Sequence, residues 1–126
     1  TSADVVADLQ TMHDGSMYTI GEVSGVPGFD LEVDFAKVTS ISAIVVRAFY
    51  EGSATHFVRV QLYNYDTTTW DTIHTLATGS DYQQHFKTIV SDDNYISSGV
   101  AIVRVYHTES GDASHDIHID YVGLKK

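Results

Sequence analysis

Aromatic and basic side chains alternate along two segments of the chain, a pattern that could bind a sugar or another protein. Arg59, Tyr63 and Tyr65 occupy odd positions of one segment, and Arg104 and Tyr106 occupy even positions of another. In two neighbouring strands, these five side chains would share one outward face. Tyrosine offers an apolar ring and a hydroxyl group, and arginine adds planar N–H donors, so the face suits a ligand rich in hydroxyl groups. The alternative is that Arg–Tyr pairs merely stabilise an exposed sheet.

Histidine and aspartate alternate in the segment 115–120, which reads His-Asp-Ile-His-Ile-Asp. On a strand, Asp116, His118 and Asp120 would lie on one face and could present two carboxylates and an imidazole to Zn²⁺, with His115 or His107 completing the set. The spacing matches none of the recognised zinc motifs. A solvent-facing stripe that bonds to neighbouring strands is therefore the favoured interpretation.

Motifs of nucleophilic catalysis are missing from the sequence. The chain has no cysteine and no G-x-S-x-G segment. Acidic residues that alternate with hydrophobic ones, as Asp30, Glu32 and Asp34 do, are typical of the solvated face of a strand. Because no set of residues fills the usual catalytic roles, we expect a protein that is not an enzyme.

The charge balance excludes two classes of partner. The 126 residues include 17 acidic and 7 basic side chains, which gives a net charge of -10. Phosphate contacts and docking on anionic lipid both need a surplus of arginine and lysine, so we expect no nucleic-acid partner and no membrane insertion. The apolar stretches are also far shorter than a membrane span.

Hydrophobic residues recur at every second position over most of the chain, which is the period of a half-buried strand. The clearest case is 29–35, FDLEVDF, where each odd residue is apolar and each even residue is acidic. The polar turns between such runs are too short for crossover helices, so we expect an all-β fold. Its architecture is a two-sheet antiparallel β-sandwich, with a jelly roll favoured. The pattern predicts about eight strands, at 17–23, 29–35, 41–50, 57–65, 70–76, 83–90, 100–107 and 117–124.

Residues 1–126 are expected to form a single β-sandwich domain, because the chain contains no linker, repeat or low-complexity segment. Residues 1–15 are an N-terminal extension in this interpretation. Ser2 could cap a short helix there, with Val5, Val6 and Leu9 on its apolar side.

Two segments resemble galactose-binding-like jelly rolls. Residues 60–73, VQLYNYDTTTWDTI, resemble the central hairpin of that superfamily, in which a polar turn leads into a structural tryptophan, here Trp70. Residues 115–124, HDIHIDYVGL, resemble its closing strand. Together with 25–30, GVPGFD, this style of sequence also resembles small modules of tailed-bacteriophage virion proteins.

The resemblance implies a non-enzymatic module with one of two roles. The favoured role is a viral structural protein that decorates a bacteriophage capsid or tail, located in the virion. Such a protein contacts capsid or tail proteins and forms a homo-oligomer on assembly. The alternative is a secreted carbohydrate-binding module that recognises glycans through the Tyr/Arg face or through loops. Fold by itself does not choose between these roles.

The resemblance also implies a structural Ca²⁺, which galactose-binding-like domains often hold in a loop. Asp92 and Asp93 lie in one polar loop and Asp112 in another, and their carboxylate oxygens are of the kind that Ca²⁺ prefers. Acidic residues that only keep a turn solvated are the alternative. No other cofactor is expected.

Overall fold

The computed structural model describes residues 18–126, and within this range it contains strands and turns but no α-helix. The helix predicted within residues 1–15 lies outside the described residues. No helix of the described part could cross a membrane. The strands are β1 (Tyr18–Gly21), β2 (Phe29–Phe35), β3 (Ala43–Glu51), β4 (Val58–Asn64), β5 (Thr69–Leu76), β6 (Gln83–Thr88), β7 (Ala101–His107) and β8 (Asp116–Lys125).

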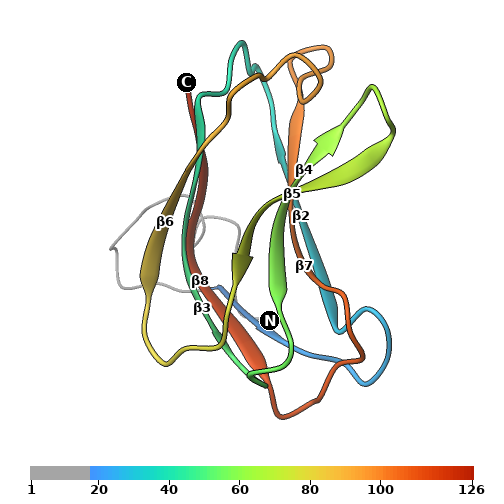
Figure 1. The fold of residues 1–126 in the computed structure, drawn as a ribbon, viewed down its shortest axis with the longest axis vertical. Coiled ribbons are helices and arrows are strands. Elements are labelled where there is room, and N and C mark those ends of the chain that lie inside the picture. Colours follow the sequence, from blue (N-terminus) through green and yellow to red (C-terminus); the bar gives the residue numbers. More distant parts are fainter. Residues whose placement is uncertain (1–17) are drawn as a thin grey trace.

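The eight strands form two four-stranded sheets, with the orders β1-β8-β3-β6 and β2-β7-β4-β5 (Figure 1). The pairs β1·β8, β2·β7, β3·β6 and β4·β5 are all antiparallel. The first strand therefore pairs with the last, the second with the seventh, the third with the sixth and the fourth with the fifth. This pairing results when one long hairpin wraps around a sandwich, and it defines the jelly roll. The predicted all-β class and jelly-roll architecture are confirmed.

The core lies between the two sheets and is built from alternate residues of the inner strands. On β4, Val58, Val60 and Leu62 are fully buried, as the alternation predicts, and on β7 Val103 and Val105 are buried opposite them. Each such side chain contributes about 1.5–3 kcal/mol by leaving water. Burial of this face fixes the register, and therefore fixes which side chains of β4 and β7 point outward.

One predicted face is wrong beyond the middle of β8. The alternation places Asp120 outward with Asp116 and His118, but the register of β3 and β8 shifts between Arg47 and Ala48. Arg47 lies opposite Tyr121 and Ala48 lies opposite Ile119, so the backbone register passes over Asp120. This β-bulge inserts one residue and reverses the parity of the later residues of β8. Asp120 is 3% exposed, and its Oδ2 lies 3.0 Å from Nη1 of Arg47, which compensates for the burial of its charge.

The jelly roll gathers its loops at two opposite ends (Figure 1). The β1–β2, β3–β4 and β7–β8 connections lie at one end (Figure 1), and backbone bonds such as Gly111 N–H to the Gly25 carbonyl join the first and the last of them. The β6–β7 connection lies at the other end, because β7 runs the length of the sandwich between it and the β7–β8 loop. Seven strand residues separate the two ends by about 20 Å.

Candidate functional site

The outer face of the sheet β2-β7-β4-β5 carries the predicted Tyr/Arg residues. Strands β4 and β7 are neighbours, with Arg59 opposite Tyr106 and Gln61 opposite Arg104. Tyr63 continues the same face of β4 and lies opposite Trp70 of β5. The structure therefore brings the predicted residues of both segments onto one surface, as the alternation requires.

Arg104 is the centre of this surface. Its guanidinium carbon lies 4.3 Å from the ring centre of Trp70 and 4.0 Å from that of Tyr106, so two aromatic rings flank one cation. Its Nε donates to Oε1 of Gln61 at 2.8 Å, and its Nη1 lies 3.9 Å from Oδ2 of Asp30. Stacking and the hydrogen bond hold the guanidinium in one position, and the guanidinium in turn holds the two rings. These side chains therefore lose little further conformational freedom when a ligand binds.

Three rings continue the surface toward the β4–β5 turn. Tyr63 makes an edge-to-face contact with Trp70 at 5.1 Å and a second one with Tyr65 at 5.0 Å. The Tyr65 hydroxyl donates to the Val100 carbonyl at 3.1 Å, which fixes the end of this row. Burial raises the pKa of Tyr65, and the nearby carboxylate of Asp34 raises it further. We name the surface formed by Tyr63, Tyr65, Trp70, Arg104 and Tyr106 the aromatic face.

The depth of burial differs across this surface. Trp70, interpreted from the sequence as a packing residue, is half-buried on the outer face, where it stacks on Arg104 and contacts Tyr63. Gln61 lies on the same face but is only 5% exposed, because it bonds to Arg104 and to Thr72 beneath the larger side chains. Arg59 is exposed beside Tyr106 and makes no described contact with Tyr63, so it lies at the margin of the aromatic face.

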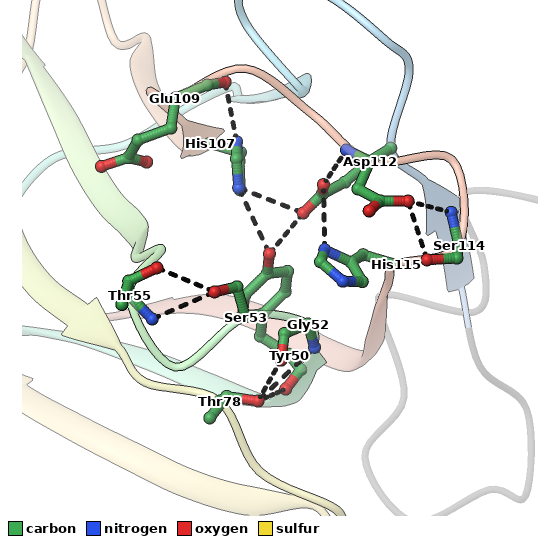
Figure 2. Close-up of polar contacts among 11 residues, drawn as sticks. Tyr50, Gly52, Ser53, Thr55, Thr78, His107, Glu109, Asp112, Ser114 and His115 are labelled. Carbon is green, nitrogen blue, oxygen red and sulfur yellow. Dashed lines mark hydrogen bonds and ion pairs between the residues drawn. The ribbon is translucent and has the colours of Figure 1, made fainter.

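A second polar cluster lies at the loop end, around the buried Glu22. Figure 2 labels the partners of this carboxylate: Tyr50, His107, Asp112 and His115. Oε1 of Glu22 accepts a hydrogen bond from the Tyr50 hydroxyl at 2.5 Å and lies 3.1 Å from Nε2 of His107. Oε2 accepts the backbone N–H of Asp112 at 2.7 Å and lies 3.5 Å from Nδ1 of His115. Burial and the hydrogen bond to Glu22 raise the pKa of the Tyr50 phenol. We call this group the Glu22 cluster.

Two glycines let the loops approach closely enough to build the Glu22 cluster. A Cβ added at Gly111 would overlap the carbonyl oxygen of Val23 and lie 2.8 Å from Cα of Gly28, and one added at Gly28 would lie 2.6 Å from Nδ1 of His107. Backbone therefore packs directly on backbone here, a contact that only glycine permits. The sequence does not predict this cluster, because its members come from three distant parts of the chain, around residues 22, 50 and 107–115.

The predicted His/Asp stripe of β8 is divided among separate contacts. His118 lies 3.2 Å from the Thr19 hydroxyl through Nδ1 and 3.0 Å from Oε2 of Glu51 through Nε2, and its ring stacks on Phe49. Asp120 bonds to Arg47 instead. Glu51, Asp116 and His118 still form a group with ligand atoms within 4.8 Å of one another, but both nitrogens of its histidine have partners.

The carboxylates expected to hold calcium lie at opposite ends of the sandwich, so they cannot share one ion. Oδ2 of Asp92 accepts the backbone N–H of Ile41 at 2.6 Å, which ties the β6–β7 loop to the start of β3, and Asp93 is exposed next to it. Oδ1 of Asp112 accepts two hydrogen bonds from Ser114, which lower the pKa of Asp112. Ca²⁺ needs six to eight oxygens, so binding in either loop stays a prediction.

A pocket of about 350 Å³ opens between β5 and β6, where the two sheets are not joined. His74 and His85 line it, with ring centres 4.4 Å apart, and Nε2 of His74 is buried without a hydrogen-bond partner among the described residues. Burial lowers the pKa of His74 to about 4, and the adjacent His85 and Lys87 add to the effect. Burial also lowers the pKa of His85.

This pair predicts a loss of stability in acid. Between pH 6.5 and about 4 the unfolded chain binds a proton at His74 and the folded chain does not, so the free energy of unfolding falls as the pH drops through this window. The lowered pKa corresponds to at most about 3 kcal/mol. Urea titrations at pH 6.5 and at about pH 4 give the free energy of unfolding at the two ends of this window. Between them, His74→Gln should lose less unfolding free energy than the wild type. Gln84→Ala, an exposed neighbour on β6, should lose as much as the wild type; equal losses in all three proteins would contradict this assignment.

Comparison with known proteins adds a structural likeness. No protein-family model matches the chain, and no curated protein is similar to it in sequence. Among solved structures, the chain is similar to the carbohydrate-binding module CBM36 in complex with calcium and xylotriose. The two chains are 15% identical with a TM-score of 0.47, and the match covers 91% of this chain and 94% of that one. The jelly-roll assignment rests on the strand order of the protein itself.

Proposed function

We propose that this domain is a non-catalytic carbohydrate-binding module that holds a glycan on the aromatic face. The observation that carries the proposal is the position of Arg104 between the rings of Trp70 and Tyr106, with Tyr63 packed against Trp70. Half-buried rings in fixed orientations, next to polar groups at fixed positions, are what a flat ligand with apolar faces and a hydroxyl rim requires.

The residues of the aromatic face have different roles in this proposal. Arg104 is only 15% exposed, so it chiefly positions the two rings, while Trp70 and Tyr63 provide the surface on which a sugar ring stacks. Asp30 is 36% exposed at the side of the face and can accept hydrogen bonds from sugar hydroxyl groups. The acidic surface does not oppose such a ligand, because neutral glycans carry no charge.

The carbohydrate-binding role is tested by titrating the chain with neutral oligosaccharides of several backbones. We expect Trp70→Ala to weaken binding of the responsive oligosaccharide by at least about 10-fold, equivalent to about 1.4 kcal/mol. Arg104→Lys keeps the charge but not the planar stack, so it should also weaken binding. Phe86→Ala is the matched control, because Phe86 is an exposed aromatic residue, 51% accessible, on the other sheet.

Two results would contradict the proposal: no binding across the panel, or binding that Trp70→Ala and Arg104→Lys leave unchanged.

The virion role expected from the resemblance of residues 25–30 gains no support from the fold or the comparisons. Its own test is binding to empty phage shells. The carbohydrate proposal includes an extracellular location, because the oligosaccharides proposed as ligands occur outside the cell. A structural Ca²⁺ is compatible with the proposal, but the aromatic face does not depend on it.

A further inference from the structure

The loop end of the sandwich carries a set of metal-ligating groups that the aromatic face does not use. Glu22, His56 and His115 each offer a ligand atom, and these atoms lie within 4.8 Å of one another. They come from the β1–β2, β3–β4 and β7–β8 connections. We infer that these three residues form a binding site for a divalent transition-metal ion of the Zn²⁺ type, which joins the three connections.

Both imidazoles of this group have a nitrogen inside the protein that makes no hydrogen bond to the described residues. Nδ1 of His56 and Nδ1 of His115 are buried and have no hydrogen-bond partner among the described residues. A buried polar atom without a partner costs about 1–3 kcal/mol, and such atoms are rare in folded proteins. Two such nitrogens close to one buried carboxylate form a set of ligand atoms that a single cation can bind together.

His115 and Glu22 lie at the distance expected of two ligands on one metal ion. Nδ1 of His115 lies 3.5 Å from Oε2 of Glu22, and the two atoms do not form a hydrogen bond. Two ligands of a tetrahedral ion with bonds of about 2.1 Å are separated by about 3.4 Å, so the pair already has the spacing of two ligands on one metal. The ring centre of His56 lies 6.4 Å from that of His115, and its ligand atom lies within 4.8 Å of those of the other two residues.

The groups that surround Glu22 fix the orientation of its carboxylate. The Tyr50 hydroxyl and the Asp112 backbone N–H each donate to one of its oxygens, and His107 is held in turn by the Glu109 carbonyl, 3.0 Å from its Nδ1 (Figure 2). Partners of this kind fix a ligating carboxylate and raise the affinity of its site. Two nitrogens and one carboxylate favour Zn²⁺ and similar ions over Ca²⁺, which prefers six to eight oxygens.

The test is a titration of the metal-free full chain with ZnCl₂, followed by calorimetry and thermal unfolding. We expect one equivalent to bind and to raise the melting temperature, because an ion that binds only the folded state stabilises it. His56→Ala and His115→Ala should each weaken binding by at least about 10-fold. Both replace half-buried residues outside the strands, so the test does not depend on a Glu22 variant that fails to fold.

Two control variants address the other histidines. His118→Ala removes the histidine of the Glu51 group, and His85→Ala breaks the His74–His85 pair. Both should bind Zn²⁺ as the wild type does. The inference is overturned if the wild type binds no Zn²⁺, or if the controls lose binding while His56→Ala and His115→Ala keep it. A Ca²⁺ response that needs His56 and His115 would overturn the assigned ion type. Sugar titrations of metal-free protein decide the carbohydrate proposal separately.

Discussion

Glu22→Ala is expected to lose about 3–5 kcal/mol of stability, the cost of breaking a buried network of charged and polar groups. The carboxylate is fully buried and is the common partner of the Tyr50 hydroxyl, His107 and the Asp112 backbone N–H. Without it the Asp112 backbone N–H loses its acceptor, and the 3.2 Å contact between the Tyr50 hydroxyl and Nε2 of His107 is what remains of the network. The midpoint of urea unfolding, measured in the presence of a chelator, should fall while the slope stays constant.

Two further variants make this result specific. Tyr50→Phe removes one donor and leaves the carboxylate with its other partners, so it should cost about 1–3 kcal/mol. Glu51→Ala is the control, because its carboxylate is 62% exposed and forms only a surface contact with His118. If Glu22→Ala unfolds at the same urea concentration as Glu51→Ala, the Glu22 cluster does not stabilise the loop end.

Gly111→Ala is expected to destabilise the protein by about 3 kcal/mol or more, the upper range for overpacking. The added methyl group would collide with the Val23 carbonyl and with Cα of Gly28, and these are backbone atoms that cannot turn away. The β7–β8 loop would have to move, and the hydrogen bonds of Gly111 N–H to the Gly25 carbonyl and of Asp112 N–H to Glu22 would be lost.

The control for this variant is Gly79→Ala. A Cβ at Gly79 meets no atom within 4 Å, so its unfolding free energy should change by less than about 0.5 kcal/mol. Thermal unfolding of the two variants side by side measures the difference. Similar melting temperatures would show that the loops at this end are not packed as described.

Most of the fold could be predicted from the sequence, because the protein has a clean two-residue alternation. In β2, each apolar residue of Phe29–Phe35 is more buried than the acidic residue after it, as the pattern indicates. In the last strand, β8, the alternation predicts the wrong face for Asp120. Nothing in the segment 116–122 marks Asp120 as an inserted residue, since a bulge depends on the partner strand and the buried Arg47 contact.

The aromatic face was partly predictable and the Glu22 cluster was not. Alternation places Arg104 and Tyr63 outward, but the position of Trp70 depends on the register of β5 across β4. Glu22 and His115 come together because the Asp112 backbone N–H binds Glu22 and because Gly28 and Gly111 let their two loops pack closely. These contacts between loops form only in the complete jelly roll. The available signal was the number of histidines, 7 in 126 residues, which indicates imidazole chemistry without saying which rings meet.

The most direct test of the carbohydrate-binding account is an NMR titration of the isotope-labelled chain with the oligosaccharide that binds best. We predict that the largest shift changes occur at the Trp70 indole N–H, at Tyr63 and along Arg104 to Tyr106, which lie on one face. Signals of the loop end around Glu22 and Asp112 should stay constant. Shift changes confined to that loop end, with the aromatic face unaffected, would contradict the account.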